Sequence, residues 1–101
     1  MMAFADRVVV PKHVLVRHLE GESVLLNLDT ERYFGLDVTG TRMWALITTM
    51  PNIDAAYEKL LEEFEVEPDI LRGHLSELLG LLVDNGLLSV LPSDVGTTPA
   101  I

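Results

Sequence analysis

Few side chains in this sequence have the types and spacing that catalysis or metal binding requires. The chain has three histidines, His13, His18 and His74, and no cysteine. His13 and His18 would lie on opposite faces of a strand, because side chains alternate along it, and the histidine spacing does not suit a metal site. The absence of cysteine removes thiolate nucleophiles and cysteine metal ligands together. We therefore expect no metal, no cofactor and no catalysis by this chain.

Two carboxylates, Asp29 and Asp37, flank a predicted strand at residues 32–36. Aspartate is favoured in turns and before helices, because its side chain accepts hydrogen bonds from nearby backbone amides. The sequence also lacks the nucleophile elbow, the phosphate-binding loop and the dinucleotide-binding glycine motif. We expect Asp29 to be a turn residue and Asp37 a pre-helix residue, not an acid–base pair.

With catalysis and metal binding by side chains disfavoured, the interaction left to consider is hydrogen bonding by the main chain of three predicted strands. They cover about residues 13–19, 23–28 and 32–36, and the connections are short enough for an antiparallel meander. The last strand would then lie at an edge of the sheet. An edge strand offers unpaired N–H and C=O groups to any extended peptide.

Three helices are predicted to follow, at about residues 40–50, 54–64 and 68–86. Thr39 is expected to cap the first helix with its hydroxyl, and Trp44 is expected in the core between sheet and helices. Gly86 can end the third helix in a left-handed conformation.

The two ends of the chain are less regular in sequence. Residues 1–12 are expected to form an irregular lead-in, and residues 87–91 a short apolar extension that packs back on the domain. A chain of 101 residues is long enough for one domain with a modest core. We place this domain at residues 1–90 and expect a flexible tail at residues 91–101.

The predicted third helix is more apolar than a surface helix needs to be. At about 100° per residue, its apolar side chains cover about 220°, whereas packing on one side needs little more than about 100°. Either the helix is central and packed on both sides, or one shoulder of the arc lines an open groove beside the sheet. The middle of the arc, expected in the core, comprises Leu71, Leu75, Leu78 and Leu82. One shoulder comprises Ile70, His74 and Leu81, and the other Leu79 and Val83. We favour the first shoulder as the groove wall, because a histidine with its polar tip tolerates a half-wet groove.

Charge and hydropathy exclude several classes of partner. The chain carries sixteen acidic and seven basic residues, a formal charge of −9. Such a surface repels phosphate backbones, so nucleic-acid binding is disfavoured. No stretch is long and apolar enough to cross a bilayer, and the first residues lack the pattern of a secretory signal. Because the lack of cysteine fits a reducing compartment, we expect a cytoplasmic protein without membrane or nucleic-acid partners.

The segment from Leu26 to Trp44 resembles one family closely. The pattern comprises Leu26-Asn27-Leu28-Asp29-Thr30-Glu31-Arg32-Tyr33-Phe34-Gly35-Leu36-Asp37, then Thr39-Gly40 and Met43-Trp44, with Asn85-Gly86-Leu87-Leu88 at the end of the last helix. It is similar to the PqqD-like family, the recognition elements of pathways that make ribosomally synthesised and modified peptides (RiPP recognition elements). The resemblance spans about residues 8–90, and the opening segment 6–11 makes the chain most similar to the stand-alone B1 proteins of lasso-peptide biosynthesis.

This resemblance implies an α+β fold like that of winged helix-turn-helix domains, with a three-stranded antiparallel sheet followed by three helices. It implies a non-catalytic module that captures the leader segment of a precursor peptide by β-strand addition to the third strand. In lasso systems the leader typically carries a Tyr-x-x-Pro pattern. A separate cysteine protease of the B2 type would receive the leader, and a cyclase would follow, because no catalytic domain is fused to these 101 residues.

The implied binding site lies between the third strand and the third helix. Its expected residues are Glu31, Arg32, Tyr33, Phe34, Gly35 and Leu36 on the strand, and Ile70, Leu71, His74, Leu78 and Leu81 on the helix. Tyr33 and Gly35 share one strand face. Gly35 is expected to leave room for a bulky leader side chain, in a pocket walled by leucines of the third helix. At least one of Tyr33 and Phe34 is expected to pack within the sheet or the core instead.

Two other functions remain open from the sequence. A peptide chaperone that serves a radical enzyme, like PqqD itself, would differ only in its client. A winged-helix DNA-binding protein would need a basic recognition helix. The predicted second helix is acidic, and the third has Arg72 as its one basic residue besides His74. DNA binding is therefore the least favoured of these functions.

Overall fold

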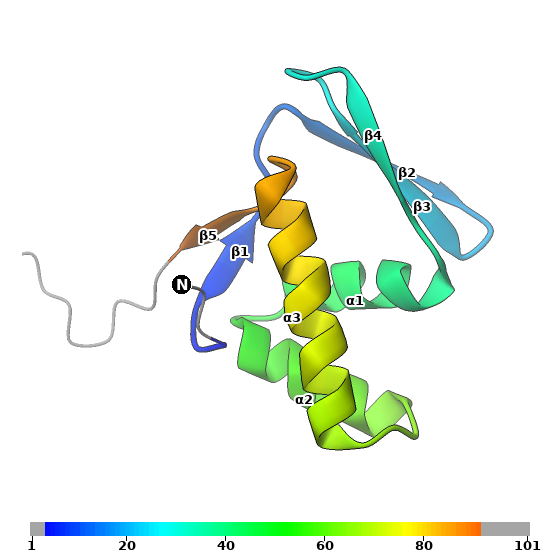
Figure 1. Ribbon diagram of the computed structural model, residues 1–101, viewed down its shortest axis with the longest axis vertical. Coiled ribbons are helices and arrows are strands. Elements are labelled where there is room, and N and C mark those ends of the chain that lie inside the picture. Colours follow the sequence, from blue (N-terminus) through cyan, green and yellow to red (C-terminus); the bar gives the residue numbers. More distant parts are fainter. Residues whose placement is uncertain (1–3, 92–101) are drawn as a thin grey trace, which may run out of the picture.

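The computed structural model describes residues 4–91, which form two small sheets and three helices (Figure 1). The strands are β1 (Arg7–Val9), β2 (Val14–Leu19), β3 (Glu22–Asn27), β4 (Arg32–Leu36) and β5 (Ser89–Leu91). The helices are α1 (Val38–Thr49), α2 (Ile53–Glu63) and α3 (Pro68–Asp84). This layout confirms the predicted α+β fold, in which a three-stranded antiparallel sheet precedes three helices as in winged helix-turn-helix domains.

The larger sheet is an antiparallel meander with the strand order β2-β3-β4. Glu20 and Gly21 connect β2 to β3 with φ values of 48° and 88°. Two consecutive positive φ values suit the tight hairpin turn that matches the twist of its strands. The turn from β3 to β4 ends at Glu31, which also has a positive φ of 61°. Among residues 4–91, β2 and β4 therefore form the two edges of this sheet.

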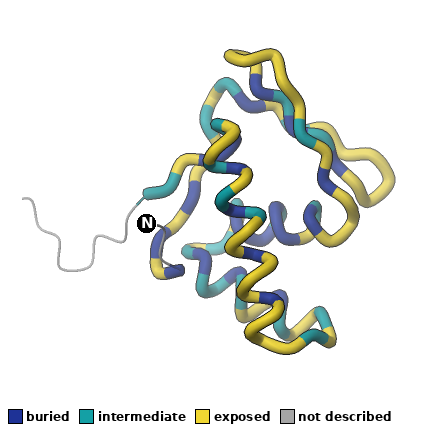
Figure 2. The backbone as a smooth tube through the Cα atoms, in the orientation of Figure 1, coloured by how far each residue is buried: buried dark blue, intermediate teal, exposed yellow. Residues whose placement is uncertain are grey.

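The register of the sheet separates its side chains into an inner and an outer face. Leu25 pairs with Val16 and Phe34, and this row faces the helices, since Leu25 is completely buried. The neighbouring residue Val24 pairs with Arg17 and Gly35 on the outer face. The alternation is clearest in β3, where buried residues alternate with less buried ones (Figure 2).

Helix α1 covers the inner face and packs against β3 and β4. It begins two residues earlier than the sequence indicated: Asp37, not Thr39, is the N-cap, and its carboxylate accepts a 2.7 Å hydrogen bond from the Gly40 amide. The prediction for Thr39 was wrong because aspartate caps at least as well as threonine, and Asp37 has the correct spacing to Gly40. Gly40 itself allows a close approach, since a Cβ there would lie 3.2 Å from the Asp37 carboxylate.

The core lies where α1, α2 and α3 meet beneath the sheet. Trp44 is only 4% exposed, which confirms its predicted place in the core. On α3 the buried row comprises Leu71, Leu75, Leu79 and Leu82. Leu78, predicted as core, is instead only partly buried, and Leu79 takes its place in this row. No helix within residues 4–91 is both long enough and apolar enough to cross a membrane.

The amino-terminal segment is more regular than predicted. Residues 7–9 form β1, which pairs with β5 in a separate two-stranded sheet, with Val8 opposite Val90. The expectation of an irregular lead-in was therefore wrong for these residues, because their partner strand lies about eighty residues away and leaves no local signal. The predicted extension at residues 87–91 does pack back, with Leu87 and Leu88 buried. Leu91 ends β5, and the rest of the predicted tail lies outside the described residues.

We predict that Leu75→Ala destabilises the fold far more than Leu81→Ala. Leu75 is completely buried, whereas Leu81 is 50% exposed. Removing a buried leucine side chain typically costs about 2–5 kcal/mol of unfolding free energy, whereas an exposed truncation costs about 0.5 kcal/mol or less. Urea unfolding of both variants measures the difference. Equal losses would contradict the assignment of the two helix faces.

Candidate functional site

The open edge of the sheet is the first component of the site. One side of β4 pairs with β3, and no other strand within residues 4–91 pairs with its second side. Strand β5, the last strand along the chain, pairs with β1 rather than with β4. Alternate residues of an unpaired edge direct their N–H and C=O groups away from the sheet. The predicted edge strand is therefore present and available in the described part of the chain.

Helix α3 presents a definite side toward the sheet. Its Arg72 guanidinium lies 4.0 Å from the centre of the Phe4 ring, so that side of the helix faces the amino-terminal segment. The backbone oxygen of Asn85, just after the helix, accepts a hydrogen bond from Asn27 of the sheet. Asn85 and Arg72 are separated by about 140° around the axis at about 100° per residue. The shoulder on the Asn85 side carries His74, Leu78 and Leu81, and this shoulder faces the sheet.

Apolar side chains of this shoulder are exposed. Ile70 is 49% exposed and Leu81 is 50% exposed, although both are large aliphatic residues. His74 is exposed as well, and Leu78 is partly buried. An unpaired strand offers main-chain partners, and an exposed apolar helix shoulder offers apolar contact area; a peptide-binding groove needs both components.

Not every predicted site residue offers its side chain to this groove. Leu36 and Leu71 are 5% and 2% exposed and belong to the core. Phe34 lies on the inner face and packs partly against the core, as expected for one of the two aromatic residues. Arg32 is exposed on the same inner face, at the start of β4, and Glu31 lies in the turn before it.

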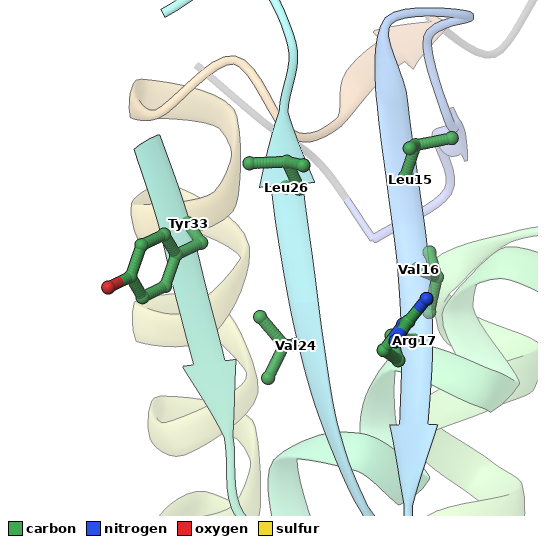
Figure 3. Close-up of a pocket in the computed structure, with 6 residues that line it drawn as sticks. All are labelled: Leu15, Val16, Arg17, Val24, Leu26 and Tyr33. Carbon is green, nitrogen blue, oxygen red and sulfur yellow. The ribbon is translucent and has the colours of Figure 1, made fainter. Parts of the chain in front are cut away.

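Tyr33 and Gly35 lie on the opposite face from the helix. In Figure 3 the Tyr33 ring projects from the outer side of β4, and α3 lies behind the strand. Gly35 is opposite Val24 on the same outer face, and a Cβ at Gly35 would meet no atom within 4 Å. The predicted pocket that combined Gly35 with leucines of α3 was therefore wrong. The strand alternation was correct, but the sequence did not show which face the helix covers.

A polar hollow that the sequence did not predict lies at one end of β4. A hollow of about 580 Å³ lies where β4 begins and α3 ends, and it is lined by Asn27, Thr30, Arg32, Asp84, Asn85 and Gly86. Asn27 is only 3% exposed although it is polar. An asparagine at the end of an otherwise apolar strand was the available signal, because a buried amide must find hydrogen-bond partners.

A second unpredicted feature is the apolar outer face of the sheet. A shallow hollow of about 460 Å³ is lined by Leu15, Val16, Arg17, Val24, Leu26 and Tyr33 (Figure 3). Leu15 is 52% exposed and Tyr33 is 76% exposed. The alternating apolar residues of β2 and β3 were visible in the sequence. The sequence did not show that the helices cover only one face of the sheet, so the other face was not predicted to be exposed.

No cluster of three histidine or carboxylate side chains that could hold a metal ion occurs among residues 4–91. Hydrogen bonds from Arg42 hold the pKa of Glu63 below its usual value, and Glu63 raises the pKa of Arg42 in return. This pair joins α1 to the end of α2, so it contributes to helix packing and not to the groove.

Three comparisons relate this geometry to known proteins. A sequence model of the family described as "Coenzyme PQQ synthesis protein D (PqqD)" matches residues 22–88. The solved structure "TbiB1 in Complex with the TbiA(beta) Leader Peptide" is similar with a TM-score of 0.74 and 30% identity, over 79% of this chain and 93% of that one. Another, "Lasso peptide synthetase B1 complexed with the leader peptide", has a TM-score of 0.67 over 85% of this chain and 99% of that one. At 21% identity it shows likeness of fold alone. No curated protein matches significantly.

Proposed function

Since this chain belongs to the PqqD family, as its sequence pattern predicted, we propose that it is a non-catalytic module that binds the leader segment of a ribosomally made precursor peptide. The leader adds as a strand to β4, in the groove between β4 and α3. The observation that carries this proposal is the unpaired edge of β4 beside the exposed shoulder of α3. The similar TbiB1 structure, whose description names a leader peptide, supports the class of ligand.

The groove can supply enough free energy for specific capture. Main-chain hydrogen bonds along β4 provide affinity that tolerates different sequences, and the side chains of α3 provide selectivity. Burying an aromatic or aliphatic leader side chain against Ile70 and Leu81 contributes about 1.5–3 kcal/mol each. Two such contacts plus the strand pairing support micromolar or tighter binding after the ordering of the peptide is subtracted.

The outer face of the sheet, to which β4 contributes Tyr33, offers a surface on which a separate peptidase could receive the leader. The hollow on the outer face is lined by Leu15, Leu26 and Tyr33 together with Arg17, and the β2–β3 and β3–β4 turns carry Glu20 and Asp29. A partner fits this face if it is apolar at its centre, acidic opposite Arg17 and basic opposite the two turns. Because Tyr33 belongs to β4, such a partner would lie beside the bound leader without blocking the groove. We propose that the leader peptidase, of the B2 type, docks here.

The client pathway has two candidates within the family. The family description names a protein of coenzyme synthesis, which would make the chain a chaperone for a radical enzyme. The similarity to TbiB1 at 30% identity favours the lasso-peptide type. Neighbouring genes separate the two: a cysteine protease with a cyclase supports the lasso type, and a radical enzyme with quinone-cofactor genes supports the other.

We predict that Leu81→Asp weakens leader binding at least about tenfold, which corresponds to about 1.4 kcal/mol. The variant places a charge where the leader would bury an apolar group, and stability should change little because Leu81 is half exposed. Calorimetric titration with a synthetic leader of the precursor encoded beside this chain measures the affinity. Val38→Asp is the matched control, since Val38 is 60% exposed and its side chain lies beside Gly21 of the β2–β3 turn. Equal effects of both substitutions would count against the groove.

The mode of binding predicts a pattern with a period of two in the peptide. If the leader pairs with β4, N-methylation of a leader amide abolishes a hydrogen bond only at alternate residues, those whose N–H faces the strand. We expect each such position to lose roughly threefold to thirtyfold in affinity, and the intervening positions to lose little. Fluorescence anisotropy with a set of singly N-methylated leaders measures this. A pattern without alternation would show that the leader binds in another way.

For the docking face, we predict that Leu15→Asp leaves leader affinity unchanged and slows leader removal at least about fivefold. Leu15 lies on β2, which is separated from β4 by β3, so its substitution does not touch the groove. The readout is the rate at which the separately purified peptidase cleaves the precursor in the presence of each variant. The docking proposal fails if Leu15→Asp and Val38→Asp support the same rate as the unmodified chain.

A further inference from the structure

We infer that Asn27 is a positioning residue for the groove: it ties the sheet to the end of α3 and thereby sets the separation of β4 and α3 that a leader meets. This inference rests on the proposed leader-binding function. Asn27, together with His13, forms a set of hydrogen bonds at one end of the groove, which we call the clasp. The clasp consists of polar groups that bond within the protein, so its proposed role differs from that of Ile70 or Leu81.

The Asn27 side chain uses both ends of its amide. Its nitrogen Nδ2 donates a 3.0 Å hydrogen bond to the backbone oxygen of Asn85, just after α3. Its oxygen Oδ1 accepts hydrogen bonds from the amides of Asp29 at 2.9 Å and Thr30 at 3.2 Å. A single buried side chain thus shapes the β3–β4 turn and links that turn to the helix. Removing one of these partners would leave a buried polar group unpaired, which is costly.

His13 makes a second link to the same end of α3. Its Nε2 lies 3.0 Å from the backbone oxygen of Gly86, and its Nδ1 lies 3.5 Å from a carboxylate oxygen of Asp29. Gly86 has a φ of +70°, and a Cβ there would lie 2.9 Å from Nδ2 of Asn27. Glycine is therefore required at position 86 for two reasons, the left-handed backbone and the close approach of the clasp.

The clasp holds the beginning of β4, because Asn27 pairs with Arg32 across the sheet. Next to the clasp, a hollow lined by Asn27, Phe34 and Leu87 among others has a volume of only about 10 Å³. It has room for about one water molecule. Figure 1 shows the end of α3 near the loop that leads into β2, with β4 and α3 running apart from there. Because the clasp joins β4 and α3 at one end, it sets the distance between them at the other end. A groove held at a fixed width binds a peptide at lower entropic cost.

Asn27→Asp is the sharpest test, because the carboxylate keeps the two turn hydrogen bonds through an oxygen and replaces the donor to Asn85 with a second oxygen. We expect leader affinity, measured by calorimetry with the synthetic leader, to fall at least about tenfold. Ile53→Val serves as a stability control, since Ile53 is completely buried on α2 and takes no part in the clasp. The control should bind the leader normally although it is less stable.

A distance measurement separates positioning from mere destabilisation. The chain contains no cysteine, so spin labels can be attached to Gly35→Cys on β4 and Glu77→Cys on α3. In the free protein we expect a narrow distance distribution between the labels, a broader or longer one with Asn27→Asp, and an unchanged one with Ile53→Val. His13→Gln, whose amide can still donate to the Gly86 oxygen, should retain the narrow distribution.

The outcomes distinguish the clasp from the function on which it rests. If the unmodified chain binds the leader and Asn27→Asp binds it equally well, or if Asn27→Asp leaves the distances unchanged, the positioning role is overturned and leader binding stands. If affinity falls equally with Ile53→Val, the effect is one of stability, and the inference is likewise overturned. If the unmodified chain binds no leader, the proposed function itself fails, and with it the role of Asn27.

Discussion

A three-stranded antiparallel sheet has two edges, and the hydrogen-bonding groups along them must be satisfied by water or by another strand. This chain has a further strand available, β5, but pairs it with β1 on the far side of α3. The edge of β4 therefore stays open among the described residues. The proposed binding of an extended peptide depends on this open edge of β4.

The alternation of side chains along β4 assigns its two faces to different tasks. Phe34 and Leu36 turn inward, and they join β4 to the core that α1 and α3 complete. Tyr33 and Gly35 turn outward, onto a face that no described helix covers. A ligand at the edge between these faces contacts the inner side through α3 and leaves the outer side free. One short strand can in this way serve a peptide and a protein partner together.

The sequence predicted what local patterns determine and missed what long-range contacts determine. Strand alternation, helix periodicity and the glycine at position 86 gave the elements nearly at their observed bounds. The pairing of β1 with β5 depends on residues about eighty positions apart, and the competition between Asp37 and Thr39 for the N-cap depends on an offset of two residues. The assignment of the groove wall to the shoulder of Ile70, His74 and Leu81 stays a prediction. The sequence did not show which face of β4 the helices cover, because alternation alone is symmetric between the two faces.

The clasp explains why a polar residue persists at the end of β3. A valine at position 27 would suit strand propensity and core packing better, but it would leave the Asn85 oxygen and the amides of Asp29 and Thr30 without their partner. Apolar contacts resist separation of α3 from the sheet without fixing an angle between them, because they are not directional. Hydrogen bonds with defined donors and acceptors do fix it. A groove that binds one extended peptide must keep a fixed width. The directional hydrogen bonds of the clasp can fix this width, whereas additional apolar surface cannot.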